Sequence, residues 1–125
     1  MKKAAKKNDA VSGVDIHNEI KGQTTIPVPH NYDGYISDSV SSDVFIEGLE
    51  AATVDSVSAQ KQSHTPKGGS FVVSPNGKGH IKTGSLSVYV NGKAMARDGD
   101  FVITCSDIPT APSTIGVNSC SVEVG

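Results

Sequence analysis

Residues 41–56 read SSDVFIEGLEAATVDS, and residues 85–100 read SLSVYVNGKAMARDGD. Because Ser85 follows Ser41 by 44 positions, the two stretches align without a gap. The identical positions are Ser41 and Ser85, Val44 and Val88, Gly48 and Gly92, and Ala52 and Ala96. A duplicated strand-turn-strand unit in so short a chain predicts a pseudo-symmetric β-fold rather than an enzyme pocket.

Each copy has the composition of a short β-hairpin. Phe45-Ile46 and Tyr89-Val90 are aromatic and β-branched, and the turn dipeptides Glu47-Gly48 and Asn91-Gly92 follow them. Asn-Gly is the strongest short hairpin signal, and glycine supplies the positive φ that a tight turn needs. The sequence therefore predicts two hairpins.

The rest of the chain also favours strands. We predict further strands near residues 71–74, 79–83, 101–105 and 121–124, separated by glycine- and proline-rich breakers. No stretch sustains a helical apolar period for three turns. Pro27 and Pro29 precede His30, and because proline cannot extend a central strand, we expect His30 on a rigid loop. The predicted fold class is all-β.

Length and charge limit the class of protein. A chain of 125 residues forms one domain, and its formal charge of -2 offers no field for phosphate backbones, so nucleic acid is excluded as a partner. The apolar runs are far shorter than the roughly 20 residues that a membrane-spanning helix needs. Residues 1–7 carry four lysines, but polar residues follow where the apolar core of a signal peptide would lie. We expect a flexible arm at residues 1–14, a single domain at residues 15–125, and cytoplasmic synthesis without a signal peptide.

Four residues carry the chemistry of a metal site: His17, His30, His64 and Cys105, each of which lies beside a chain breaker or a predicted strand end. Three imidazoles and one thiolate complete a tetrahedral zinc shell, with no position left for a water nucleophile. These residue types predict one structural zinc ion per chain, although their spacing follows no local finger motif.

Other assignments are open for the remaining ligand-type residues. Cys120 has the same ligand chemistry as Cys105 and could replace it, and either cysteine could be a small buried apolar residue. We expect both to be reduced, since cytosolic thiols seldom form a disulfide. His80 fits an ordinary surface histidine.

Enzyme signatures are missing from the sequence. There is no nucleophile elbow, no His-Glu-x-x-His helix and no glycine-rich phosphate loop, so we assign no catalytic or cofactor-binding residue and expect no turnover. Arg97, Asp98 and Asp100 form a charged turn, which we expect to be a solvated ion pair of small energetic value.

Residues 84–100, GSLSVYVNGKAMARDGD, closely resemble the signature of PAAR-repeat proteins, the tips of contractile injection machines. The Pro-Ala-Ala-Arg tetrapeptide of that family corresponds to Ala94-Met95-Ala96-Arg97, in which two of the four letters survive. The flanking Val-Asn-Gly-Lys and Arg-x-Gly-Asp contexts are intact, whereas the first copy, with Glu50-Ala51-Ala52-Thr53, is more degenerate.

The wider layout is also similar to that of PAAR-like proteins. An early Asp-x-His, the Pro29-His30 loop, His64-Thr65-Pro66 and Thr104-Cys105 alternate with the hairpins, so the resemblance spans residues 15 to about 105. It implies a small β-cone whose hairpins converge on an apex, where His17, His30, His64 and Cys105 bind zinc.

The resemblance also implies a structural function. The base of the family's cone sits on the blunt end of a trimeric spike protein, in type VI secretion systems, extracellular injection particles or contractile phage tails. The tip sharpens the spike for penetration of a target envelope and contacts the target membrane only then. It would be assembled into the particle and expelled with the spike, and effector or cargo proteins could travel with it as separate chains.

Two other functions are open. A small β-fold zinc hydrolase would use His17, His30 and His64 with a bound water, and would need an open coordination position and a carboxylate base, for which Asp15 and Glu19 are closest in sequence to His17. A metal-free adaptor would bind a cargo protein through exposed strand edges. Metal content separates the adaptor from the tip, and coordination number separates the hydrolase from the tip.

Overall fold

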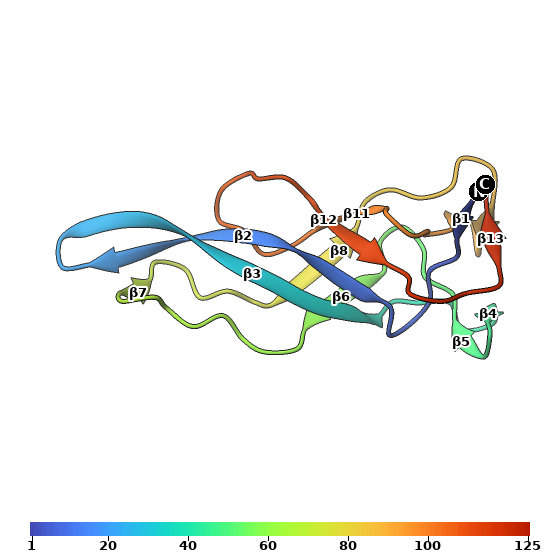
Figure 1. The fold of residues 1–125 in the computed structure, drawn as a ribbon, viewed down its shortest axis with the longest axis horizontal. Helices are drawn as coiled ribbons and strands as arrows, with labels where there is room; N and C mark the ends of the chain where they lie inside the picture. Colours follow the sequence, from blue (N-terminus) through green and yellow to red (C-terminus); the bar gives the residue numbers. More distant parts are fainter.

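The computed structural model describes all 125 residues, and these form strands, turns and loops without a helix. This confirms the predicted all-β fold class. Accordingly, no helix is long and apolar enough to cross a bilayer. The strands are β1 (Lys2–Lys3), β2 (Ala10–Lys21), β3 (Thr24–Asp38), β4 (Phe45–Ile46), β5 (Leu49–Glu50), β6 (Val57–Gln60), β7 (Ser70–Phe71), β8 (Lys78–Ile81), β9 (Tyr89–Val90), β10 (Lys93–Ala94), β11 (Phe101–Ile103), β12 (Ser113–Gly116) and β13 (Glu123–Val124) (Figure 1).

Antiparallel strands close into a small barrel in the order β12, β11, β8, β6, β3 and β2, because β12 pairs with both β11 and β2. Closure removes the free edges that an open sheet would expose. β2 and β3 are the longest strands, and they continue past the barrel as a hairpin that forms the narrow, left-hand end in Figure 1. Near the tip of this hairpin, β7 pairs with Glu19 and Ile20 of β2.

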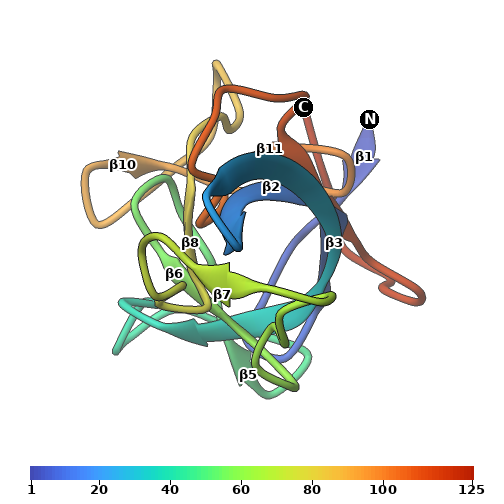
Figure 2. The same ribbon diagram turned by 90° about the vertical axis from the view of Figure 1, so that its left-hand side faces the viewer.

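The two predicted hairpins are present at the broad end, as the antiparallel pairs β4–β5 and β9–β10. Their turn residues have positive φ: 51° at Glu47, 84° at Gly48, 52° at Asn91 and 80° at Gly92. Two consecutive positive φ values define the turn whose twist matches a two-residue hairpin. Figure 2 looks along the molecule from the narrow end and shows β5, β10 and β1 at separate positions around it.

Three extended segments meet at the broad end, and we call them the base ring: residues 4–9, 51–56 and 95–100. Each contributes a fully buried alanine at the equivalent position: Ala5, Ala52 and Ala96. Backbone bonds join these alanines in a closed cycle, since Ala5 N–H donates to Ala96 O at 3.0 Å, Ala52 N–H to Ala5 O at 3.1 Å and Ala96 N–H to Ala52 O at 2.9 Å. Isolated bridges link the same segments in pairs: Ala4 with Arg97, Lys6 with Ala51, and Thr53 with Met95.

Each segment of the base ring ends in a similar tight turn. Positive φ values of 77°, 77° and 83° occur at Asn8, Asp55 and Gly99. The side chain after each of these residues accepts a backbone N–H from three positions earlier. The three bonds are Lys6 N–H to Asp9 Oδ2 at 2.9 Å, Thr53 N–H to Ser56 Oγ at 3.0 Å and Arg97 N–H to Asp100 Oδ2 at 2.7 Å.

One of these turns differs from the sequence-based expectation of a solvated ion pair. The Asp100 side chain is only 3% exposed and that of Arg97 17%, and Arg97 Nη2 donates to Asp100 Oδ1 at 2.9 Å. The carboxylate is buried because it fills the inside of the turn and also accepts the Thr83 hydroxyl at 3.0 Å. The pair is therefore a buried structural interaction.

The apolar core lies in the barrel and the base ring. Its largest fully buried side chains include Ile36, Ile81, Ile115 and Tyr32. The Tyr32 hydroxyl bonds to Ser58 Oγ at 2.9 Å, and burial raises the pKa of this phenol to about 12. On β3, Tyr32 is the last core residue toward the narrow end, because the next buried residue of that strand is His30.

The N-terminal segment differs from the flexible arm expected for residues 1–14. Lys2 and Lys3 pair with β13, Ala4 and Ala5 are fully buried in the base ring, and Val11 is a buried core residue of β2. The lysine-rich composition suggested a solvated arm. The alanines between the lysines are small enough to pack where three backbones approach one another.

His30 also differs from the expectation of a rigid loop, since it lies within β3 and pairs with Asp15 of β2. Pro27 and Pro29 are tolerated in this strand because its far edge is open there: β3 pairs with β6 only from Gly34 onward. A proline costs no ladder hydrogen bond where its nitrogen faces an open edge.

Candidate metal centre

The narrow half of the β2–β3 hairpin reverses the usual pattern of a half-buried strand. Asp15, His17 and Glu19 alternate along β2 and are all buried, whereas Val14 and Ile20 on the opposite face are 42% and 43% exposed. Successive strand residues point to opposite faces, so the three ionisable side chains share the inner face. The interior of the narrow end is therefore polar.

Four ligand-type residues meet in this interior. One ligand atom from each of Asp15, His17, His64 and Cys105 lies within 4.8 Å of the others. Asp15 and His17 come from β2, His64 from the loop between β6 and β7, and Cys105 from the segment after β11. Cys105 Sγ lies 3.2 Å from Asp15 Oδ2 and 3.7 Å from His17 Nε2. The donor set and its spacing can hold a metal ion.

The structure thus brings together three of the four predicted ligands and adds Asp15. The fourth, His30, lies beside the cluster with its ring centroid 5.2 Å from that of His64 and 5.7 Å from that of His17. His30 Nε2 is bonded to Glu19 Oε2 at 2.8 Å.

The alternatives from the sequence lie elsewhere. Cys120 packs against the apolar clusters of the barrel and the broad end. His80 is exposed on β8. Neither residue belongs to the cluster, which leaves Cys105 as its sulfur donor.

Phe71 covers the imidazoles from β7. Its ring lies 5.7 Å from the His17 ring and 5.5 Å from the His30 ring. Gly69 allows this approach, because a Cβ at that position would lie 3.0 Å from the carbonyl carbon of Ile20. An aromatic cover of this kind limits the access of water to the site.

Burial sets the protonation states of the metal-free site. It raises the pKa of the Cys105 thiol to about 12, and the nearby Asp15 carboxylate acts in the same direction. Burial also lowers the pKa of His64, against the opposing effect of Asp15. At neutral pH the thiol is therefore protonated and His64 is neutral, so a metal ion that binds here displaces the thiol proton.

The same geometry argues against a cysteine nucleophile. Cys105, His17 and Asp107 lie in the order of a thiol hydrolase triad, with His17 Nδ1 3.3 Å from Asp107 Oδ1. A nucleophilic cysteine needs a lowered pKa, usually supplied by positive charge, whereas burial and the neighbouring Asp15 carboxylate raise the pKa of Cys105. Metal ligation suits this thiol better than covalent catalysis.

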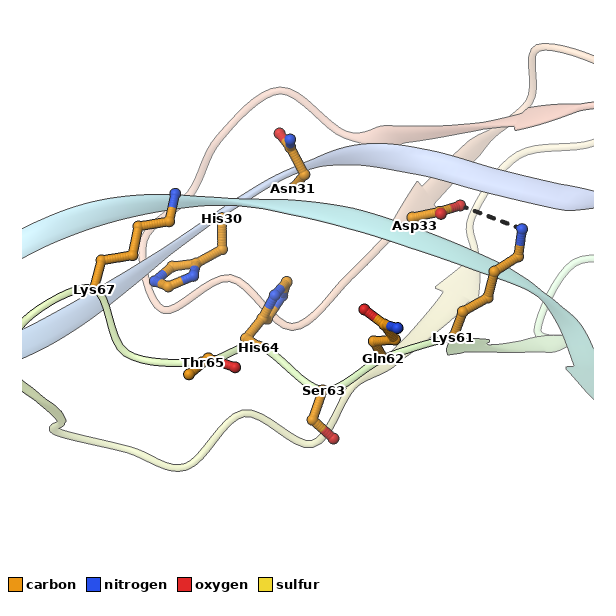
Figure 3. Close-up of a pocket in the computed structure, with 9 residues that line it drawn as sticks. All are labelled: His30, Asn31, Asp33, Lys61, Gln62, Ser63, His64, Thr65 and Lys67. Atoms are coloured by element: carbon orange, nitrogen blue, oxygen red, sulfur yellow. Dashed lines mark ion pairs between the residues drawn. The ribbon is translucent and has the colours of Figure 1, made fainter.

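An open groove of about 500 Å³ runs beside the cluster, and only polar and charged residues line it (Figure 3). His30 and Lys67 lie toward one end, the ion pair of Lys61 with Asp33 lies toward the other, and His64 lies between them. The groove gives solvent a route to the outer side of His64.

Sequence reasoning missed Phe71 and Asp107 as parts of the site, and it named Asp15 only as a possible base of a hydrolase. The alternation of Asp15, His17 and Glu19 was a usable signal, because it places all three on one strand face. Asp107 and Phe71 gave no such signal, since each reaches the site only through tertiary pairing with β2.

A comparison of the chain with models of known protein families gave no match, and a comparison with curated proteins gave none either.

Proposed function

We propose that this chain is the metal-stabilised tip of the central spike of a contractile injection system, and that its broad end caps a trimeric spike protein. The base ring is the observation that carries this proposal: its three segments make equivalent backbone bonds in a closed cycle. The end of a trimer presents three identical surfaces, so a single chain that caps it needs three similar surfaces of its own. The narrow end would then point away from the spike protein.

The side chains at the broad end suit a protein partner. Phe45 of β4 and Tyr89 of β9 occupy matching positions in the two hairpins and are 54% and 60% exposed. Leu86, just before β9, is 91% exposed. Exposed aromatic residues are the usual anchors of protein interfaces, whereas the turns around them are polar enough for solubility before assembly.

The metal belongs to the opposite end of the molecule. We propose zinc, held by His17, His64 and Cys105 with His30 or Asp15 in the fourth position. The donor types suit Zn²⁺, and His17, His64 and Cys105 come from three separate segments of the chain. A bound ion joins these segments where the apolar core is absent, and structural zinc can supply on the order of 10 kcal/mol of folding free energy.

Elemental analysis with thermal unfolding tests the metal part of the proposal. We expect about one zinc per chain in the wild type, and loss of both metal and thermal stability in Cys105→Ala and His17→Ala. Cys120→Ala is the matched control, because Cys120 lies outside the cluster. A folded wild type that binds no metal from micromolar zinc would remove the metal from the proposal and favour the adaptor.

Native mass spectrometry with a purified trimeric spike protein of such a system tests the capping. We expect one chain per trimer, weakened binding for Tyr89→Glu, and unchanged binding for Ile26→Glu, which alters an exposed residue of the narrow end. Binding of three chains per trimer, or equal losses from both substitutions, would contradict docking through the broad end.

A zinc hydrolase is the second candidate, favoured only by the groove that reaches His64. It requires a metal with a bound water, whereas the tip requires a shell closed by protein ligands. X-ray absorption of the zinc-loaded protein separates the two: a shell with one sulfur and no water oxygen supports the tip, and an oxygen ligand that exchanges with solvent supports the hydrolase.

A further inference from the structure

Each imidazole of the candidate metal centre shares one ring nitrogen with a carboxylate. The pairs are His17 Nδ1 with Asp107 Oδ1 at 3.3 Å, His30 Nε2 with Glu19 Oε2 at 2.8 Å and His64 Nε2 with Asp15 Oδ2 at 3.1 Å. The ring nitrogen differs between His17 and His30. Asp15 also contacts Cys105 Sγ, so it belongs to the cluster itself, whereas Asp107 and Glu19 lie outside the cluster.

The backbone of β2 fixes the position of Asp107. Its second oxygen, Oδ2, accepts the Asn18 N–H at 2.9 Å, and its own N–H donates to Ile16 O at 2.8 Å. Ser106 adds a further bond, since its hydroxyl oxygen accepts the Ile16 N–H at 2.8 Å. The carboxylate therefore cannot turn away from His17 without breaking bonds to β2.

Glu19 is fixed in a comparable way. Its side chain is 3% exposed, and Oε1 accepts the Lys67 N–H at 2.9 Å while Oε2 faces His30. Lys67 is tied to β3 in turn, because its Nζ donates to Pro29 O at 2.7 Å. Both oxygens of this buried carboxylate thus have a nitrogen partner on a neighbouring segment.

We propose that Asp107 and Glu19 are positioning residues that fix opposite tautomers of two histidines. An ionised carboxylate can only accept hydrogen bonds, so His17 carries its proton on Nδ1 and His30 carries its proton on Nε2. The lone pairs left free are then Nε2 of His17 and Nδ1 of His30.

This inference rests on the proposed metal site, where those lone pairs would meet the ion. His17 Nε2 is the nitrogen that lies 3.7 Å from Cys105 Sγ, which is the side of the ring that faces the cluster. Metal-binding histidines generally donate their second N–H to a carboxylate or carbonyl, which orients the ring and raises its basicity. Because Glu19 occupies Nε2, His30 can offer only Nδ1 to an ion, and because Asp15 occupies Nε2 of His64, that ring likewise has only Nδ1 free.

The isosteric amides Asp107→Asn and Glu19→Gln test the role of each carboxylate. Each carboxylate accepts one N–H on each oxygen, whereas an amide has a single accepting oxygen and one donating nitrogen. One of the two bonds must therefore be lost or the ring must change its tautomer. Asp33→Asn is the matched control, because Asp33 is an exposed carboxylate on the groove that contacts Lys61 and no imidazole.

Nitrogen-15 NMR of the histidine rings in the metal-free protein is the primary measurement, because a merely structural role would not change it. In the wild type we expect the Nδ1–H form at His17 and the Nε2–H form at His30. The amide variants should shift their own histidine toward the other tautomer and weaken zinc affinity about 10- to 100-fold, measured by competition with a chromophoric chelator, with no change in Asp33→Asn.

The opposite tautomers in the wild type would overturn the inference, even if the variants fail to fold. Unchanged tautomers and zinc affinity in both amide variants would overturn it as well. A wild type with the expected tautomers that binds no zinc would refute the proposed metal site and leave the carboxylate assignment standing, so the two failures are distinguishable.

Discussion

Replacement of Asp100 by alanine removes a buried carboxylate from the base ring together with all its hydrogen bonds. Oδ2 accepts the Arg97 N–H at 2.7 Å and Nε–H at 3.0 Å, and Oδ1 accepts Arg97 Nη2–H at 2.9 Å and the Thr83 hydroxyl at 3.0 Å. The substitution therefore leaves a guanidinium, a backbone N–H and a hydroxyl without their partner.

The expected loss follows from the burial of the two partners. Breaking a fully buried ion pair by removing one member costs about 3–5 kcal/mol, because the other charge stays unpaired. The Arg97 side chain is 17% exposed and can regain part of its hydration, so we expect the lower end, about 3 kcal/mol. For a chain of this length that corresponds to a fall in Tm of roughly 10–15 °C.

The base ring contains its own control for this prediction. At the equivalent turn, Ser56 Oγ accepts the Thr53 N–H at 3.0 Å, and neither of these two residues is charged. The double variant Arg97→Thr/Asp100→Ser copies that turn and should be more stable than Asp100→Ala, although it loses the packing of the arginine stem. We would measure urea and thermal unfolding by circular dichroism, with zinc in excess for all proteins.

A loss below about 1 kcal/mol in Asp100→Ala would refute the reasoning, since it would make the pair equivalent to a surface ion pair. A double variant no more stable than the single one would also refute it. In that case the arginine charge would not be the source of the loss, and the turn geometry of residues 53–56 would not transfer to residues 97–100.

Two further predictions concern glycine and turn positions. Gly13→Ala should lower stability by about 1–3 kcal/mol, because a Cβ there would lie 2.8 Å from Ser113 Cα, where β2 pairs with β12. Gly116→Ala is the control and should have little effect, since a Cβ at that position would have no other atom within 4 Å. Equal Tm values for the two variants would contradict the close approach at Gly13. Asn91→Ala should cost about 1 kcal/mol from backbone strain at its φ of 52°, and Asn91→Gly should relieve this strain, although both variants lose the side-chain bonds to Asp43 and Ser41. The Asn91 amide helps to hold the pKa of Asp43 below its ordinary value, so the stability from this bond is present above the pKa of Asp43 in the unfolded chain and is lost as the pH falls. The difference in unfolding free energy between wild type and Asn91→Ala should therefore be larger at pH 7 than at pH 3.

The hairpins were predictable from the sequence because each is a local unit with its own turn dipeptide. The third segment of the base ring was not, although Ala4-Ala5 aligns with Ala51-Ala52. Its partner strand, β13, lies at the other end of the chain, so β1 and β13 form no continuous stretch that could be compared with the two copies. A pair of strands divided between the two termini leaves only half of its pattern at each end.

The sequence singled out His17, His64 and Cys105, which the structure brings together, since histidine and cysteine are scarce in this chain. The carboxylates were not predictable, because aspartate and glutamate are expected on any soluble surface. The sequence analysis predicted no strand at residues 10–21, so the polar alternation there was not used. Asp15, His17 and Glu19 follow strict alternation, but the alternation points inward, and only the pairing of β2 with β3 and β7 reveals the direction.

The two ends of the molecule are therefore stabilised by different interactions. At the broad end, the closed alanine cycle and the buried isoleucines supply apolar packing and a continuous backbone network. At the narrow end two long strands enclose too little volume for an apolar core, and a polar interior without partners would be costly. Every buried side-chain nitrogen and oxygen has a hydrogen-bond partner, which the carboxylate–imidazole pairs provide. Directional bonds can thus hold a narrow structure that burial alone cannot, and a metal ion would strengthen the same network without enlarging it.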